Sequence, residues 1–168
     1  MRTILLAGTL TAITLGPPVP SAAAQSITPV SPTRVEESVV TRKARGTFDV
    51  KLTPQPMHSP DLGRLTIDKE LHGDLEAVSV GEMLSAMTAV KGSAGYVAME
   101  LVRGTLMGRK GTFVLQHSAL MNRGAPELTV LVVPDSGTEE LTGLTGRFNI
   151  IIEGGKHSYE FEYDLPGE

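Results

Sequence analysis

The sequence predicts an all-β domain, an eight-stranded antiparallel β-barrel, that follows an export signal and a flexible arm. Three observations indicate this fold class. From residue 44 onward, apolar and polar residues alternate with a period of two. Glycine or proline interrupts that alternation at regular intervals, as turns between strands do. Almost no segment of the domain has the periodicity of a confident helix.

The first 24 residues have the features of a secretory signal peptide. Arg2 gives a short basic start, an apolar stretch covers residues 4–16, and Pro17 and Pro18 end any helix there. The stretch is shorter than the roughly 20 residues that a membrane-spanning helix needs. We therefore expect cleavage after Ala24, export to the periplasm or the exterior, and no membrane insertion after cleavage.

The rest of the chain divides into two parts, an arm and a domain. Residues 25–43 are rich in Pro, Ser and Thr with isolated charges, which is typical of a flexible arm. Residues 44–168 contain one continuous alternating pattern and no internal repeat, so they are expected to form a single barrel domain.

Composition excludes several classes of function. The net charge is −4 and the chain has no Trp, so it has neither the basic surface nor the stacking platforms of a nucleic-acid-binding protein. The chain has no Cys, which excludes disulfides, thiol catalysis and Cys-ligated zinc. The fold must therefore be stable through its core alone.

Each expected strand has one apolar face. Residues 96–106 and 112–121 are two long strands around a hairpin turn at residues 107–111, whereas residues 84–95 fit either a short helix or a loop at a barrel mouth. Such a pattern suits an up-and-down barrel or a sandwich, and one enclosed interior accounts for every apolar face. The other expected inward positions are Phe48, Val50 and Leu52; Leu65, Ile67 and Leu71; Leu75, Ala77, Ser79, Gly81 and Met83; Leu128, Val130 and Val132; Phe148, Ile150 and Ile152; and Tyr159, Phe161, Tyr163 and Leu165.

Ordered motifs run from about Ala44 to Pro166, and they are Gly46-Thr-Phe-Asp-Val50, His72-Gly-Asp-Leu-Glu76, Gly81-Glu-Met-Leu84, Lys91-Gly-Ser-Ala-Gly-Tyr96, Phe113-Val-Leu-Gln-His117, Val133-Pro-Asp-Ser-Gly-Thr138, Leu141-Thr-Gly-Leu-Thr-Gly146 and Gly155-Lys-His-Ser-Tyr159. Together they resemble a bacterial family, the domain-of-unknown-function family 3224. The resemblance implies an eight-stranded, calycin-like barrel similar to that of allene oxide cyclase. It implies no settled activity and no established catalytic residue, and the signal peptide and arm are additions to the domain.

Glu100 and His117 are the candidate catalytic residues. A turn centred on Gly108 and Arg109 places them directly opposite each other, and a turn one residue later displaces them by one diagonal step. Both registers put the two side chains on one face, which we expect to point inward. A buried carboxylate beside an imidazole is a candidate pair for proton transfer. The alternative is a structural hydrogen bond in which the two buried polar side chains satisfy each other in the core.

Four neighbours on the same face are the candidate ligand-binding residues: Tyr96, Phe113, Leu115 and Met121. Tyr96 would place a phenol in the cavity, or would simply pack there with its hydroxyl satisfied. Gln116 has the opposite parity and is expected to face outward.

No metal site and no cofactor are predicted. His58, His72 and His157 are separated in sequence and none has metal-ligand spacing. A site assembled in space from Glu100, His117 and a third ligand is the alternative. Motifs for a catalytic serine or a phosphate-binding loop are absent.

The predicted function is binding of a small hydrophobic or amphipathic ligand inside the barrel. The first alternative is an isomerase or cyclase that uses Glu100 and His117 for proton transfer, a reading that depends mostly on fold analogy. The second is a structural, self-associating domain with a filled interior. A homodimer is compatible with such barrels, although the sequence pattern does not indicate an interface.

Overall fold

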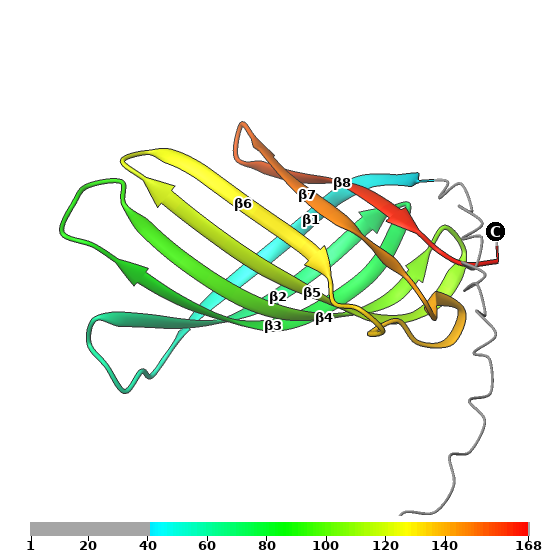
Figure 1. The fold of residues 1–168 in the computed structure, drawn as a ribbon, viewed down its shortest axis with the longest axis horizontal. Helices are drawn as coiled ribbons and strands as arrows, with labels where there is room; N and C mark the ends of the chain where they lie inside the picture. The colour runs from blue at the N-terminus through cyan, green and yellow to red at the C-terminus, as the bar shows by residue number, and fades with distance from the viewer. Residues whose placement is uncertain (1–40, 168) are drawn as a thin grey trace, which may run out of the picture. The chain divides into compact units, whose positions relative to one another are not determined.

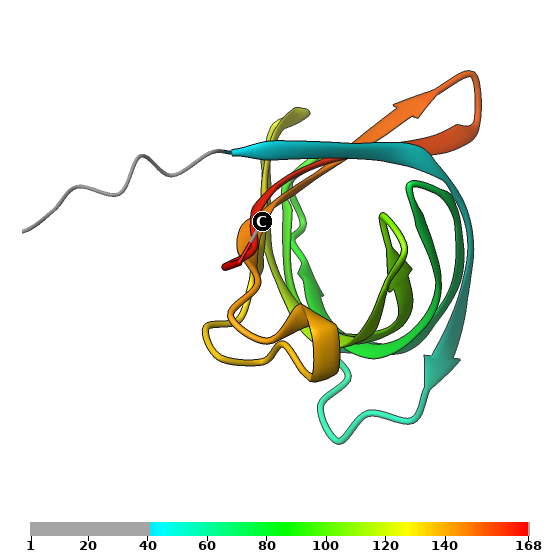
Figure 2. The same cartoon turned by 90° about the vertical axis from the view of Figure 1, so that its right-hand side faces the viewer.

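The computed structural model describes residues 41–167, and these form one closed antiparallel barrel in which each strand pairs with the next and β8 pairs with β1. Figure 1 shows the strands from the side, and Figure 2 shows the ring of strands from one end of the barrel. The predicted signal peptide and almost all of the predicted arm lie outside the described residues. The elements are β1 (Arg42–Gln55), β2 (Leu62–Gly73), β3 (Leu75–Met87), β4 (Ala94–Leu106), β5 (Arg109–Asn122), β6 (Ala125–Val132), the 3₁₀ helix η1 (Glu139–Leu141), β7 (Thr145–Glu153) and β8 (Lys156–Asp164).

One half of the barrel interior is filled. Its centre is Phe161, whose ring lies 5.8 Å from that of Phe113, 5.6 Å from that of Phe148 and 5.3 Å from that of Tyr163, measured between centroids. Side chains at alternate positions of the strands point to this side because successive residues of a strand face opposite ways. Leu141 and Leu144, which flank the end of η1, are fully buried and cover this end, called here the closed end.

Tyr159 of β8 links the β2–β3 turn to β8 at the closed end. Its hydroxyl accepts a hydrogen bond of 2.9 Å from the backbone N–H of Leu75 and donates one of 3.3 Å to the carbonyl of His72. The ring lies against Gly46, where an added Cβ would come within 2.6 Å of the hydroxyl oxygen. Gly46 is therefore required for the close approach of β8, β1 and the β2–β3 turn.

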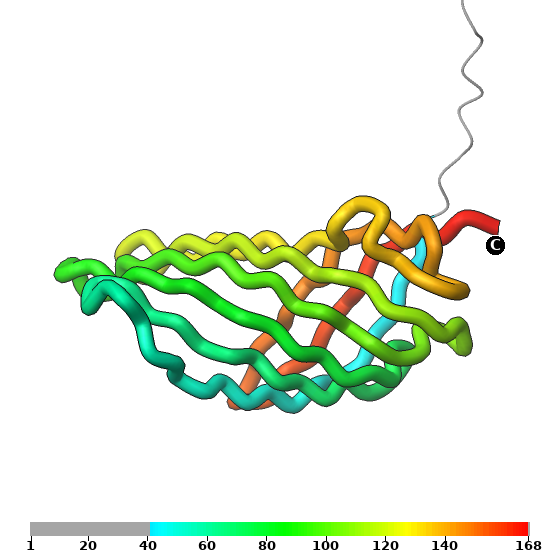
Figure 3. Tube along the Cα trace, turned by 90° about the horizontal axis from the view of Figure 1, so that it is seen from below, coloured from blue at the N-terminus to red at the C-terminus, as the bar shows by residue number. Residues whose placement is uncertain are grey.

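The opposite end, called here the open end, is walled by fewer strands. β2 to β6 extend to it, whereas the β7–β8 hairpin turns back well short of it (Figures 1 and 3). β6 and β7 share a single residue pair, Leu131 with Arg147, and β1 pairs with β8 only over residues 42–47. The barrel is thus continuous at the closed end and much less tightly sealed towards the open end.

The structure decides one open alternative and corrects two expectations. The ambiguous residues 84–95 contain no helix: β3 continues to Met87 and the chain turns at residues 88–93 before β4. The β4–β5 turn is centred on Met107 and Gly108, earlier than either predicted centre, and both have positive φ (48° and 87°), as a two-residue hairpin turn requires. Finally, β1 begins at Arg42, within the predicted arm.

Most of the predicted inward positions are buried or half-buried, whereas Leu52, Leu128 and Ile152, also predicted to face inward, are 48%, 38% and 63% exposed. Phe48, Leu71, Leu75, Val130 and Phe148 are among the buried core residues.

Among residues 41–167 no helix is long and apolar enough to cross a membrane.

Candidate functional site

Four polar side chains are buried together in the middle of the barrel, one from each of four neighbouring strands. Lys69 comes from β2, Ser79 from β3, Glu100 from β4 and His117 from β5. Their exposed fractions are 7%, 2%, 0% and 3%, respectively. All four occupy inward positions of the strand alternation. We call these four residues the central cluster.

Glu100 is the centre of this cluster. One carboxylate oxygen, Oε2, lies 2.7 Å from Nζ of Lys69 and 3.0 Å from Nε2 of His117. The other oxygen, Oε1, accepts a hydrogen bond from the hydroxyl of Ser79. Lys69 is further stabilised by the ring of Phe48, whose centroid lies 5.0 Å from Nζ. A buried charge pair with these additional partners meets the conditions under which such pairs persist in a core.

The His117 contact differs from the other two. Its Nε2 is within ion-pair distance of Glu100, yet it is buried without a hydrogen-bond partner among the described residues. The ring therefore approaches the carboxylate out of line for a good hydrogen bond, since such bonds weaken steeply when they are bent. Lys69 and Ser79 are the geometrically sound partners of Glu100.

Burial by itself would raise the pKa of Glu100, but its neighbours outweigh that effect. The close but bent contact of His117 Nε2 with the carboxylate, the charge and hydrogen bond of Lys69, and the hydroxyl of Ser79 together lower the Glu100 pKa from 4.5 to about 2. Glu100 is accordingly ionised at every physiological pH. It has no proton to donate near neutrality, and it is a weak proton acceptor.

Above the central cluster, the open end of the barrel contains a pocket of about 580 Å³. Its walls are residues of β3 to β6 together with the 88–93 turn, and most of them are apolar, with uncharged polar groups at Ser85, Thr88, Ser93 and Tyr96. The main contributors are Met83, Met87, Val90, Tyr96, Ala119, Met121 and Leu128, with Lys91 and Glu127 also in the lining. This volume lies within the roughly 300–1,000 Å³ of sites for small molecules. We call it the mouth pocket.

Small residues separate the mouth pocket from the central cluster. On β5, Ala119 lines the pocket and His117 is the next inward residue. On β4, Tyr96 lines the pocket and Ala98 is the only inward residue between it and Glu100. On the neighbouring β3, Gly81 pairs with Glu100 at this level.

Tyr96 is the polar group of the mouth pocket with a clear chemical role. It is half-buried, and its hydroxyl makes no hydrogen bond within the part of the chain that the structure describes. Burial raises its pKa, and the negative charge of Glu100 raises it further. The phenol is therefore neutral and free to donate a hydrogen bond to a bound molecule.

The predicted site residues fall into two groups. Glu100, His117 and Tyr96 face inward as expected, and Met121 lines the mouth pocket. Phe113 and Leu115, the other two candidate ligand-binding residues, are fully buried in the filled half and lie outside the pocket lining.

The pairing of β4 with β5 also differs in detail from expectation. Glu100 lies opposite Leu115, and His117 lies opposite Ala98, so the two side chains meet diagonally. The earlier turn centre shifts the register by two residues, which leaves both faces unchanged. Gln116 faces outward and is exposed, as predicted.

Lys69 was missed by sequence reasoning. It stands between Ile67 and Leu71 and shares their inward parity, so the alternation itself carried the signal. A lysine at such a position is usually solvated, and the buried carboxylate of Glu100, 2.7 Å from Lys69 Nζ, makes the inward orientation favourable. Ser79 was placed on the inward face but not in a site.

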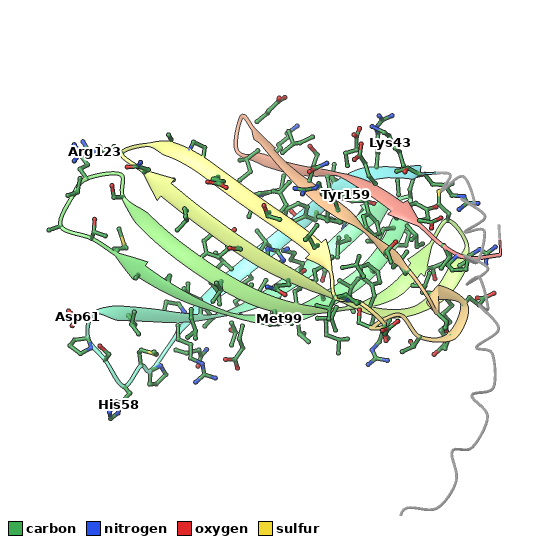
Figure 4. All side chains as sticks on the ribbon, viewed as in Figure 1. Lys43, His58, Asp61, Met99, Arg123 and Tyr159 are labelled. Atoms are coloured by element: carbon green, nitrogen blue, oxygen red, sulfur yellow. The ribbon has the colours of Figure 1, made fainter. Side chains whose placement is uncertain are left out.

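The remaining histidines lie apart from the site. His58 projects from the tip of the β1–β2 loop (Figure 4), His72 is exposed at the end of β2, and the ring of His157 packs on Phe48 at 5.1 Å. Within residues 41–167 no three His, Asp or Glu side chains come close enough together to hold a metal ion.

Comparison with known proteins identifies the barrel. The family described as protein of unknown function (DUF3224) matches residues 44–163. The chain belongs to the DUF3224 family. A solved DUF3224 structure from Shewanella oneidensis MR-1, also of unknown function, is 53% identical with a TM-score of 0.73, and the match covers 76% of this chain and 99% of that chain. The search of curated proteins finds no match.

The DUF3224 relationship supports the eight-stranded barrel and carries no activity with it. The function of this DUF3224 domain therefore depends on the geometry of its own site, because a shared fold does not determine what a site does.

Proposed function

We propose that this DUF3224 barrel binds a small, uncharged and mainly apolar molecule in its mouth pocket. The observation that carries the proposal is the mainly apolar pocket of about 580 Å³, which lies above a buried cluster centred on the ionised Glu100. Apolar walls provide the affinity because burying apolar surface is favourable. Few polar groups in the lining then fix the orientation of the ligand.

The central cluster favours a neutral ligand end. Glu100 stays negatively charged, and Lys69 already neutralises it at 2.7 Å. A ligand carboxylate or ammonium brought to this depth would lose its hydration without gaining a free countercharge. A carbonyl or hydroxyl group, by contrast, can accept the hydrogen bond that the Tyr96 phenol offers.

The charged group of an amphipathic ligand would lie at the other end of the pocket. Lys91 and Glu127 belong to the lining there, and both are exposed to solvent. Such a ligand would enter with its apolar end first. Binding of neutral and amphipathic molecules is thus compatible with one orientation, in which the apolar body occupies the pocket.

The enzymatic alternative has less physical support. An isomerase or cyclase mechanism through Glu100 and His117 needs one of them to accept and return a proton near neutral pH. The low pKa of Glu100 and its contacts with Lys69 and Ser79 favour a structural role for the carboxylate. The export expected from residues 1–24 stays a prediction.

Filling the mouth pocket tests the proposed function. We expect the full chain to bind the neutral fluorescent probe N-phenyl-1-naphthylamine, and the Ala119→Trp variant to bind it at least about tenfold more weakly, because the indole occupies the pocket. Fluorescence titration measures both affinities. Gln116→Trp, which faces outward on the same strand, is the matched control and should bind like the unaltered chain.

Two results would contradict the proposal. One is a chain that fails to bind the probe although its circular dichroism is that of a folded β protein. The other is unchanged affinity in the folded Ala119→Trp variant, because the probe would then be bound elsewhere.

The role of Tyr96 is tested with a matched pair of competitors. We expect Tyr96→Phe to weaken displacement of the probe by 2-dodecanone about fivefold, the equivalent of one lost hydrogen bond, and to leave displacement by dodecane unchanged. Competition titration gives both values. Equal effects on the two competitors would show that Tyr96 contributes only packing, while the pocket itself would stand.

A further inference from the structure

Within residues 41–167, the wall of the barrel is incomplete on one side of the open end. β7 and β8 lie between β6 and β1 in the order of the sheet, and both are too short to continue there. β6 has no ladder partner on this side beyond the pair of Leu131 with Arg147, and β1 has none beyond residue 47. Figure 1 shows the β7–β8 hairpin diverging from β6. Two free strand edges therefore face the opening, residues 125–130 of β6 and 48–55 of β1.

Inward apolar side chains are exposed along this opening. Leu128 of β6, Leu52 of β1 and Ile152 of β7 are 38%, 48% and 63% exposed, although each has the inward parity of its strand. Residues of the same parity deeper in the barrel, such as Val130 and Phe48, are buried. The absence of a neighbouring strand accounts for the difference, because an added strand would cover these side chains with its own inward residues.

The backbone of β6 directs unused hydrogen-bonding groups into the opening. Just after the strand, the N–H of Val133 donates to the carbonyl of Val114 on the β5 side at 2.9 Å. Because the groups of an antiparallel strand alternate between its two neighbours, odd-numbered residues of β6 bond to β5 and even-numbered ones point away from it. Pro126 agrees with this assignment, since proline has no N–H and occurs on edge strands where none is needed. Leu128 thus has an N–H and a carbonyl, and Val130 an N–H, that meet no strand among the described residues.

These free groups identify the class of partner. N–H and carbonyl groups at a strand edge are matched by the backbone of another extended peptide, and strand addition of this kind is a recurring mode of peptide recognition. An apolar small molecule or a lipid tail cannot pair with them. The free stretch of β6 has the length of an ordinary strand, about five residues. A single extended segment fits between β6 and β1, whereas β6 of a second copy would bring the rest of its barrel wall into the same space.

The side chains beside the edge specify the pattern of the peptide. Inward residues of an added strand would lie beside Leu128, which lines the mouth pocket, so they should be apolar. Outward residues would lie beside Glu127 and Thr129, which are both exposed, so they should be polar. A cation opposite Glu127 is favoured, because opposite charges on facing strand residues attract. The matching segment therefore alternates apolar and polar residues and carries one basic residue.

We propose that the free edge of β6 binds an extended peptide segment of another protein by antiparallel strand addition. The central apolar residue of the peptide bonds with the N–H and the carbonyl of Leu128. The peptide residues two positions before and after it pair with the N–H of Val130 and the carbonyl of Pro126. The added strand closes the side wall of the mouth pocket at Leu128. Peptide binding goes beyond the proposed ligand binding and does not depend on it, because the peptide is held by backbone groups outside the pocket.

A pair of N-methylated peptides tests this arrangement on the full chain. We expect saturable binding of fluorescein-labelled Thr-Val-Thr-Leu-Lys-Val-Thr, measured by fluorescence anisotropy. Methylation of the leucine nitrogen should weaken binding at least about tenfold, because it removes the bond to the Leu128 carbonyl and places a methyl group against the edge. Methylation of the lysine nitrogen, which points away from β6, is the matched control and should change the affinity less than about threefold. Equal losses, or no binding of the parent peptide, would overturn the proposal and leave the naphthylamine result for the mouth pocket unaffected.

Amide hydrogen exchange followed by nuclear magnetic resonance locates the bound peptide. In the full chain alone, the N–H groups of Leu128 and Val130 should exchange rapidly, and the peptide should protect both, whereas the N–H of Thr129 is protected throughout by β5. Protection of Leu128 before the peptide is added would overturn the proposal. Such protection would assign the edge to a segment of this chain, such as residues 25–40, if it were independent of protein concentration, and to a second copy if it increased with concentration.

Discussion

Replacing Glu100 by Gln is expected to destabilise the barrel by about 3–5 kcal/mol, because it leaves the charge of Lys69 buried without its counterion. Lys69 is 7% exposed and Glu100 is fully buried, so water cannot take the place of the lost carboxylate without opening the barrel wall. Urea unfolding followed by circular dichroism measures the change. Glu127→Gln, an exposed carboxylate in the pocket lining, is the control and should change stability by no more than about 0.5 kcal/mol.

The paired variant separates the charge from the packing. Lys69→Met combined with Glu100→Leu removes both charges and keeps similar volumes, so it is expected to recover most of the lost stability. If the double variant were as unstable as Glu100→Gln alone, the ion pair would not be the source of the effect, and the hydrogen bond of Ser79 and the contact of His117 would have to account for it.

The same substitution changes the acid stability of the protein. Because the folded-state pKa of Glu100 is lowered from 4.5 to about 2, its stabilising contribution is complete above about pH 5 and is lost as the pH falls towards 2. The shift corresponds to about 3 kcal/mol at neutral pH. Glu100→Gln should therefore flatten the fall in unfolding free energy between these values, and an equally steep fall would contradict the low pKa.

Phe161→Ala is expected to cost a similar amount, about 3–5 kcal/mol, through a different mechanism. Phe161 is fully buried at the centre of the filled half, against Phe113, Phe148 and Tyr163. Removing the ring deletes three aromatic contacts and leaves a cavity that the closed barrel cannot collapse around. The urea midpoint should fall, while the slope of the transition should stay nearly constant.

Ile152→Ala provides the comparison for that result. Ile152 occupies an inward position near the end of the β7–β8 hairpin, yet it is 63% exposed because the hairpin stops short of the open end. Its truncation should cost less than about 1 kcal/mol. Equal losses for Phe161→Ala and Ile152→Ala would mean that the interior is not divided into a filled half and an open half.

The two halves of the barrel have different consequences for function. The aromatic cluster around Phe161 supplies stability without disulfides, which the absence of cysteine requires. That stability allows the open end to keep apolar surface in the mouth pocket exposed. A binding site formed by rigid strands holds its shape better than one formed by loops alone, and most of the mouth pocket lining comes from β3 to β6.

The sequence by itself determined the fold class and the face of nearly every strand residue. Alternation along β1, β3 and β8 assigned Phe48, Ser79 and Phe161 to the interior, because a strand has only two faces and one of them must be apolar. It also assigned Glu100 and His117 to a common inward face. Those assignments were correct although the predicted register of β4 with β5 was wrong, since a shift of two residues leaves each side chain on the same face.

Only the tertiary structure decided depth and partnership. Parity could not distinguish Phe113 in the filled half from Met121 in the mouth pocket, because the depth of a residue depends on strand tilt and on where the β7–β8 hairpin ends. It could not identify Lys69 as the main partner of Glu100 either, because these residues are 31 positions apart in sequence and lie on β2 and β4, with β3 between them. The alternation of apolar and polar residues specifies which face of the sheet a side chain lies on, whereas closure of the sheet into a barrel determines which other side chains it contacts.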